Sequence, residues 1–376
     1  MAARAGSSTN TRSSTSLLVR TSGSVTWRMS TCHQRYLNLL GEQLSGIAPL
    51  HLLTDLSMWL PDGLSTADLR SLSDEHQRRL ASELHMGITG LAYTVADIET
   101  AFPGVVWPIP GVMHPVSRFH NDTQTWFQTL DSTLRTQGRI VTRTLRDGRR
   151  LSNLLSYFIH EPSLCLWMRS QGSMQRKGHV WVIEDDVAFL GDIRLPVILY
   201  QNNPADLVSV FAPHEYIDDL WPLYVNPHFK AVFTGKPLHK WEHVERYSLV
   251  LLRRVDQALQ RGIAAYGEVF ASSMCSYSNW KCAHSDLRDM KLVPLDLALY
   301  SDSVPISRKQ LATVLRLQSK SRSRGRWVHA VKEACHLLSI ARCFRNASNV
   351  PATQSPTCTI PHVSTHSKST DSAYHT

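Results

Sequence analysis

The fold is decided by the stretch His179-Val-Trp-Val-Ile-Glu-Asp-Asp-Val-Ala-Phe-Leu-Gly-Asp192. Its apolar run, residues 180–183, is β-branched and aromatic without polar alternation, which is typical of a strand buried on both faces of a parallel sheet. Three acids follow at once, Glu184, Asp185 and Asp186, and burying them without partners would be costly. We therefore expect them at the carboxyl edge of the sheet, where α/β proteins bind ligands and where carboxylates can hold Mg2+ or Mn2+.

The segments before this stretch predict the start of an α/β domain. Residues 24–29 are a candidate strand, residues 32–44 space their apolar side chains as a helix does, and residues 47–53 form a second apolar run. Strand, helix and strand in this order are typical of a βαβ unit. The second run leads into Asp55, which is either a contact for a ribose or a base or a simple turn residue.

The half of the chain after the three acids is less regular. Residues 195–200, 206–211 and 230–234 are candidate strands. Residues 241–270 repeat apolar side chains every three to four positions, which predicts a long amphipathic helix. Residues 213–229 are rich in aromatic side chains, which fits either stacking on a sugar or a base, or a small satellite core.

This order of strand, three acids and second apolar segment resembles the acidic D-x-D signature of GT-A-type glycosyltransferases. The resemblance implies a single GT-A-like, Rossmann-like α/β domain over residues 25–302, with a mostly parallel sheet flanked by helices. It implies a metal-dependent enzyme that moves a sugar from a nucleotide-diphospho-sugar donor to a hydroxyl of a glycan, protein or lipid acceptor. The implied cofactor is Mn2+ or Mg2+, held by Asp186 and Glu184, while Glu184 or Asp185 contacts the donor.

The resemblance also suggests residues for three further roles: a contact to the departing diphosphate, a base for the acceptor hydroxyl, and a histidine ligand of the metal. Arg194 can assist the departing diphosphate, with an ordinary surface arginine as the alternative. Glu268 is the candidate base for the acceptor hydroxyl, because it closes the predicted long helix among apolar residues. The competitors for the base are Asp218, Asp219 and Glu245, and the candidates for a histidine ligand of the metal are His284 and His239.

The formal net charge of +9 is concentrated near the C-terminus. Residues 308–345 contain ten Lys or Arg residues against one acid, Glu333, a net of 10 − 1 = +9, so the remaining chain is near neutral. We expect residues 303–376 to be a basic, Ser/Thr-rich extension with one helix over residues 327–344, and residues 1–24 to be a disordered leader. A basic tail makes a nucleic-acid-binding protein, or a non-catalytic GT-A-like protein, the alternative function. The basic run 319–326 lacks the interleaved aromatic side chains that stack on bases.

Missing motifs exclude several other classes. The chain has no P-loop, G-x-G-x-x-G, G-x-S-x-G or H-E-x-x-H pattern, and it lacks the Asp-x-Asp-x-Thr of haloacid-dehalogenase phosphatases. Seven cysteines without a C-x-x-C pair argue against a zinc module and leave the redox compartment open. No apolar run approaches the roughly 20 residues that cross a bilayer, and no secretory signal is visible. The family resemblance nevertheless implies the Golgi or secretory lumen.

Overall fold

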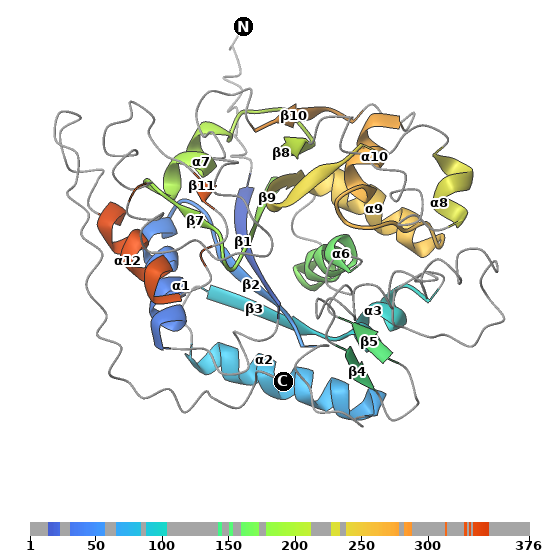
Figure 1. The fold of residues 1–376 in the computed structure, drawn as a ribbon, viewed down its shortest axis with the longest axis horizontal. Coiled ribbons are helices and arrows are strands. Elements are labelled where there is room, and N and C mark those ends of the chain that lie inside the picture. The colour runs from blue at the N-terminus through green and yellow to red at the C-terminus, as the bar shows by residue number, and fades with distance from the viewer. Residues whose placement is uncertain are drawn as a thin grey trace, which may run out of the picture.

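A seven-stranded sheet lies at the centre of the computed structural model shown in Figure 1. The structure describes residues 14–22, 31–56, 65–83, 88–103, 142–144, 150–152, 159–172, 178–211, 227–233, 238–277, 282–287, 313, 327–328, 331 and 334–345. The strands of this sheet are β1 (Ser14–Ser22), β2 (Leu50–Asp55), β3 (Ile88–Tyr93), β6 (Gly178–Glu184), β8 (Leu207–Phe211), β9 (Lys240–Ser248) and β10 (His284–Asp286). Their order across the sheet is β10-β8-β9-β6-β1-β2-β3. Strand β9 is antiparallel to both neighbours and every other pair in the sheet is parallel, so the predicted α/β class with a mostly parallel sheet is confirmed.

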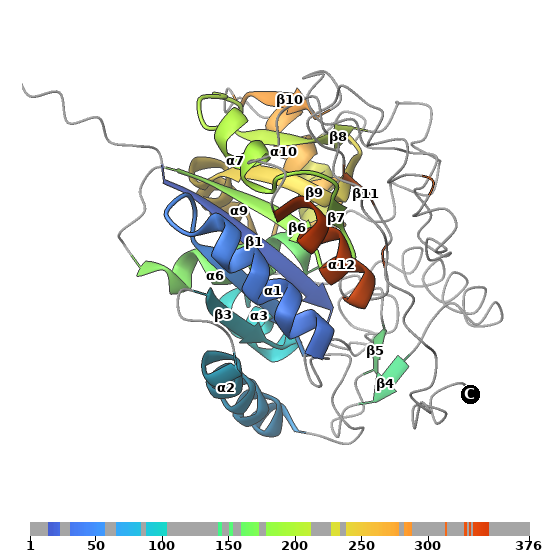
Figure 2. The same cartoon turned by 90° about the vertical axis from the view of Figure 1, so that its left-hand side faces the viewer.

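Helices cover both faces of the sheet (Figures 1 and 2). One face packs on α1 (Thr31–Leu44), α7 (Arg194–Leu199) and α12 (Ala334–Arg345), and the other on α3 (Val95–Ala101), α6 (His160–Ser170), α9 (Leu249–Gln260) and α10 (Phe270–Tyr277). Along β1, Leu17 and Val19 belong to the core on the α1 side, whereas Leu18 belongs to the core on the α6 side, because side chains alternate along a strand. Both faces of the central strands are therefore buried.

The other elements lie around this sandwich. They are α2 (Thr66–Glu83), α8 (Pro227–Val232), the antiparallel pair β4 (Thr142–Thr144) and β5 (Arg150–Ser152), and the antiparallel pair β7 (Ala188–Phe189) and β11 (Trp327–Val328). Helix α2 lies along the edge strand β3. There the Gln77 side chain accepts a hydrogen bond from the amide of Ala92 (2.8 Å) and donates one to the carbonyl of Gly90. Gln77 thus satisfies part of an open sheet edge.

The N-terminal leader prediction is wrong for residues 14–22. They form β1, which lies between β6 and β2, with Leu17 opposite both Trp181 and Leu50. The apolar core of this strand is only three residues long, and the Ser and Thr residues beside it suggested a solvated segment. Their side chains are nevertheless buried by the neighbouring strands, as Ser16 is (0% exposed). The strand predicted at residues 24–29 lies outside the described residues.

The helix predicted over residues 241–270 is found only over residues 249–260, and both its first and its last third are wrong. Residues 240–248 form β9, and the helix that follows is α9. The apolar spacing resembled a helix because the charged residues between the apolar ones were assumed to face solvent. In the structure Lys240, Glu242, Glu245 and Arg246 are each at most 1% exposed and are buried against other polar groups.

Two of the three predicted downstream strands are helical. Residues 195–199 of the first segment fall in α7, and residues 230–232 of the third segment fall in α8, whereas residues 207–211 form β8 as predicted. Short apolar runs do not distinguish a buried strand from a short helix by periodicity alone. Pro196 lies in the first turn of α7, where a helix tolerates proline.

The C-terminal extension is not a separate appendage. Its strand β11 pairs with β7, and its helix α12 packs on α1. The predicted helix over residues 327–344 is found as α12, which begins only at Ala334. A disulfide joins Cys32 of α1 to Cys335 of α12 across 303 positions of sequence. Among the described helices, none combines the length and the apolar character needed to cross a membrane.

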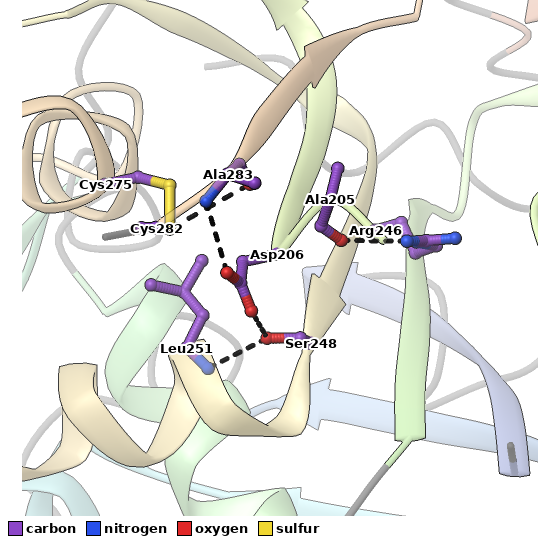
Figure 3. Close-up of a disulfide and its surroundings, with 8 residues drawn as sticks. All are labelled: Ala205, Asp206, Arg246, Ser248, Leu251, Cys275, Cys282 and Ala283. Carbon is purple, nitrogen blue, oxygen red and sulfur yellow. Dashed lines mark hydrogen bonds between the residues drawn. A yellow bond between two sulfur atoms is a disulfide. The ribbon is translucent and has the colours of Figure 1, made fainter. Parts of the chain in front are cut away.

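A second disulfide, Cys275–Cys282, lies beside a junction that orients α9 (Figure 3). Asp206, just before β8, accepts a hydrogen bond from the amide of Ala283 (3.2 Å) and one from the Ser248 hydroxyl (2.5 Å). Ser248 caps α9 by accepting from the amide of Leu251 (3.0 Å). One serine therefore connects the end of β9, the start of α9 and the start of β8.

Replacing Ser248 by alanine is expected to lower the free energy of unfolding by about 1–2 kcal/mol, because the helix cap and the bond to Asp206 are both lost. Urea denaturation followed by circular dichroism measures the change. The matched control is Ser276→Ala, at an exposed serine of α10, with an expected change within about 0.5 kcal/mol. Equal stability of the two variants would contradict the capping role.

Candidate functional site

The strand order places a topological switch between β1 and β6. From β1 the chain builds outward through β2 and β3, and it then returns to place β6 on the other side of β1. In open α/β sheets, ligands bind outside the carboxyl ends of the strands at such a switch point. The carboxyl ends of these two strands hold Arg20 and Glu184, which are register partners. The sequence prediction that the acids lie at the carboxyl edge is therefore confirmed.

Glu184, Asp185 and Asp186 form a tight turn at this edge, which we call the acidic turn. The amide of Val187 donates to the carbonyl of Glu184 (3.1 Å) and closes the turn. Asp186 is buried (7% exposed), and the other two acids are half-buried. Partly buried carboxylates in this position need nearby positive charge or hydrogen bonds.

Glu184 has two cationic neighbours. Its Oε1 lies 3.7 Å from Nη1 of Arg20, and its Oε2 forms a very short hydrogen bond with Nδ1 of His243. Burial alone would raise the pKa of Glu184, but the charge and hydrogen bond of His243 outweigh it and lower that pKa. The same contact raises the pKa of His243 against the opposing effect of burial. Glu184 and His243 are therefore a charged pair at neutral pH.

The three acids of the turn have different neighbours. The negative charge of Asp186 raises the pKa of both Glu184 and His243, so these three groups are neighbours. Asp185 instead contributes, after burial, to a raised pKa of Tyr36 on α1. Asp185 thus lies toward the face of the sheet that α1 covers. Glu184 and Asp186 instead both interact with His243.

Arg20 is the central cation of the site. It is 6% exposed, and its guanidinium lies 3.9 Å from Oε2 of Glu242 in addition to Glu184. Burial would lower its pKa, but electrostatic interactions with Tyr93 and with the carboxyl groups of Glu242, Glu184 and Asp55 raise it. Asp55, the residue predicted from the end of the second strand, is buried at the end of β2 and acts on the same guanidinium.

Glu268, the predicted base, joins this cluster from a different element than expected. It precedes α10 rather than ending a long helix, and it accepts a hydrogen bond from Nε2 of His239 (2.7 Å). Its negative charge contributes to the raised pKa of His243. Asp55, Glu184, Asp186 and Glu268 therefore all interact electrostatically with Arg20 or His243.

The other predicted residues lie elsewhere. Arg194 forms a forked ion pair with Asp192, with Nε at 2.8 Å from Oδ1, and within the described residues all its hydrogen bonds go to Asp192. His284 is exposed on β10 and contacts the ring of Phe211 (5.1 Å between centroids). Asp218 and Asp219 lie outside the described residues, as does all but the last part of the aromatic segment 213–229.

A buried ionic cluster lies behind the site, between β9 and α6. Lys240 is fully buried and lies 3.4 Å from Oε1 of Glu161 and in direct contact with Oε1 of Glu245. Glu245 also accepts from Nε2 of His160 (2.7 Å) and from the hydroxyl of Tyr247 (2.8 Å). These contacts make Glu245, one of the competing candidates for the base, a structural residue.

The sequence did not identify Arg20, His243 and Glu242 as site residues. Arg20 lay in the predicted leader, and the other two lay on the supposed solvent face of a helix. One pattern could have identified the two residues of β9. Residues 240–248 hold five charged or histidine side chains, and such a segment is stable as a buried strand only if opposite charges lie beside it.

The charges around the acidic turn suit a divalent cation. The carboxyl groups of Asp55, Glu184, Asp185, Asp186 and Glu268 outnumber the cations Arg20 and His243, so the charge around the turn is negative. Carboxylate oxygens and an imidazole are ordinary ligands of Mn2+. Within the described residues no three acidic, histidine or cysteine side chains are already arranged around a metal position. The donor types and the negative charge nevertheless fit the ion.

Comparison with known proteins returns similar structures only. No protein-family model and no curated protein matches the sequence. Core-mannan synthase A from Aspergillus fumigatus, in its Mn/GDP form, matches with 11% identity and a TM-score of 0.38 over 75% of this chain and 75% of that one. The galactosyltransferase LgtC, in complex with donor and acceptor sugar analogues, matches with 10% identity and a TM-score of 0.34 over 89% of this chain and 97% of its own. Mouse xyloside xylosyltransferase 1, in its apo form, matches with 13% identity and a TM-score of 0.28 over 69% and 80%. We therefore derive a function from the residues of this chain.

Proposed function

We propose that this protein is a metal-dependent glycosyltransferase that moves a sugar from a nucleotide-diphospho-sugar donor to a hydroxyl of a glycan, protein or lipid acceptor. The observation that carries the proposal is the meeting of the acidic turn with Arg20 and Asp55 at the switch point of the sheet. The net negative charge there would repel a diphosphate on its own. Carboxylates that hold a divalent cation, with phosphates completing its coordination, remove this conflict.

Asp186 and Glu184 are the residues that would hold Mn2+ or Mg2+. When bound, the ion supplies positive charge that stabilises the departing diphosphate. Arg20 holds Glu184 in place from the neighbouring strand. Asp55, at the end of β2, is the residue that we propose as the acceptor of hydrogen bonds from the ribose of the donor. We assign no role to Arg194, because Asp192 already occupies its guanidinium.

Glu268 is the group we propose as the base that takes the proton of the acceptor hydroxyl. Its hydrogen bond with Nε2 of His239 fixes the carboxylate at Oε2 and leaves Oε1 for an acceptor. A carboxylate held in this way needs no reorganisation when the hydroxyl arrives.

Nucleotide and metal together are expected to stabilise the protein more than either alone. With GDP or UDP at about 100 times its dissociation constant and Mn2+ present, the expected gain is about 2.7 kcal/mol. Thermal unfolding followed by fluorescence detects it, and release of the nucleotide diphosphate from a panel of donors reports turnover. Asp186→Ala is expected to abolish the stabilisation, because a proposed ligand of the ion is removed.

The matched control is Asp74→Ala, which removes an exposed aspartate from α2 and is expected to respond to nucleotide and metal as the wild type does. If no nucleotide with Mn2+ or Mg2+ stabilises the wild type, the proposed function is wrong. If Asp186→Ala still responds fully, the ion is held elsewhere.

We also propose that the protein works in an oxidising compartment such as the Golgi or secretory lumen. Two bridges support this proposal, Cys32–Cys335 and Cys275–Cys282, because disulfides persist where thiols are not kept reduced. Localisation of a tagged full-length chain by microscopy tests it.

A further inference from the structure

The described residues 327–328, 331 and 334–345, which we call the C-terminal strap, contact the acidic turn directly. The amide of Val331 donates to the carbonyl of Asp186 (2.7 Å). Immediately after the turn, β11 pairs with β7, with Trp327 opposite Phe189 and Val328 opposite Ala188. A segment about 140 positions away in the sequence therefore binds the backbone of Asp186, at the end of the acidic turn, and the backbone of Ala188 and Phe189, just after it.

Packing fixes the position of the strap. The Trp327 ring is 1% exposed, with its centroid 4.7 Å from that of Phe189 and 6.4 Å from that of Trp181. Trp181 belongs to β6, the strand that carries the acidic turn. The strap thus shares one core with the strand that ends in Glu184.

A covalent bond fixes the start of α12, the helix of the strap. Helix α12 has 12 residues, and a helix of this length is marginally stable in water without tertiary contacts. It packs on α1, where Nε2 of Gln43 donates to the carbonyl of Ala341 (3.3 Å), and the Cys32–Cys335 disulfide joins the two helices. Loss of this bridge would release one turn of α12 from α1 and weaken the contacts that follow from its docking.

We propose that the C-terminal strap is a redox-sensitive positioning device, which holds the acidic turn in its ligand-binding conformation only while Cys32 and Cys335 are bonded. Val331 and Trp327 are its positioning residues, because they contact the turn and β7 without offering a group to the ligand. A dithiol reductant would open the device. The Cys32–Cys335 bond breaks, each sulfur gains one electron and one proton, and the dithiol becomes a disulfide.

Hydrogen exchange at the turn tests the proposal without any ligand. In the oxidised Cys32→Ser/Cys335→Ser double variant, the amides of Val187 and Val331 are expected to exchange at least about tenfold faster than in the wild type. The matched control is Cys275→Ser/Cys282→Ser, which lacks the Cys275–Cys282 bridge and is expected to exchange at the wild-type rate at these two amides. Unchanged exchange in the first double variant overturns the proposal.

Two further measurements keep the test decisive. Should the Cys32/Cys335 variant not fold, wild-type protein folded first and then reduced with dithiothreitol takes its place, with the same expected increase. Trp327→Ala is expected to raise exchange at Val187 as the loss of the bridge does, and Trp327→Phe to restore it. An effect of Trp327→Ala on global stability alone, without faster exchange at the turn than elsewhere, would show a merely structural role.

The effect on binding rests on the proposed function and is measured separately. With GDP and Mn2+ as the probe, loss of the Cys32–Cys335 bridge is expected to raise the apparent dissociation constant at least about tenfold. If the oxidised wild type does not bind this probe or UDP with Mn2+, the proposed function fails, and hydrogen exchange still decides on the strap. If the wild type binds and the bridgeless variant binds equally well, the strap does not position the site.

Discussion

Replacing Lys240 by methionine is expected to lower the free energy of unfolding by about 3–5 kcal/mol, the usual cost of removing one partner of a buried ion pair. The ammonium group of Lys240 is fully buried and lies in contact with Glu245 and 3.4 Å from Glu161. Methionine fills a similar volume, so the loss of packing is small. The cost arises because the two carboxylates remain in a place that water does not reach.

The destabilisation caused by Lys240→Met should depend on pH. Burial raises the pKa of Glu245 above its ordinary value, and the charge of Lys240 opposes that rise. Without Lys240 the pKa of Glu245 in the folded protein rises further, so the folded state binds more protons than the unfolded state. Stability then falls as pH rises through this range, and the deficit relative to the wild type is larger near pH 8 than near pH 5.

Urea denaturation at several pH values measures both effects. The double variant Lys240→Met/Glu245→Gln is expected to recover part of the loss, because one of the two orphaned charges is gone. Arg169→Met is the control: Arg169 forms a single ion pair with Asp256 (2.8 Å) and its side chain is 35% exposed, so its loss should cost about 1 kcal/mol or less. A similar cost for both single variants would mean that the cluster behind the site does not stabilise the fold.

The acidic turn could be predicted from sequence because one local pattern determines it. A strand buried on both faces must be apolar throughout, as residues 180–183 are, and carboxylates directly after it can only lie at the sheet edge. Asp55 followed from the same reasoning at the end of the next apolar run. Neither prediction required knowledge of a distant residue.

The residues that surround the acidic turn could not be predicted in this way, because partners far away in the sequence determine their positions. His243 and Glu242 are stable inside a strand only because Glu184, Arg20 and His160 lie opposite them. A sequence pattern records the charges of residues 240–248 but not their partners, so an exposed helical face was the simpler interpretation. The C-terminal segment shows the same effect: its basic residues suggested an appendage, whereas contacts that include the Cys32–Cys335 bridge and the Trp327 ring attach it to the core.

Arg20 is the residue whose replacement should affect stability and function together. Arg20→Met is expected to lower the free energy of unfolding by about 3–5 kcal/mol and to abolish stabilisation by GDP or UDP with Mn2+. The guanidinium lies 3.7 Å from Glu184 and 3.9 Å from Glu242, and Asp55 contributes to its raised pKa. Its removal leaves the edge of the sheet with more negative charge and takes from Glu184 a cationic neighbour on β1.

Separate variants distinguish the two effects of Arg20. Arg20→Lys retains the charge without the planar fork, so it should recover most of the stability but less of the response to nucleotide and metal. Arg20→Met/Glu184→Gln should also regain stability, because an uncompensated carboxylate is removed, yet it should remain unresponsive because a proposed ligand of the ion is lost. Denaturation and nucleotide-dependent thermal shifts on the same preparations measure both quantities. A stable Arg20→Met protein that still responds to nucleotide and metal would show that the switch point between β1 and β6 is not the binding site, since no other described cation joins the ends of these two strands.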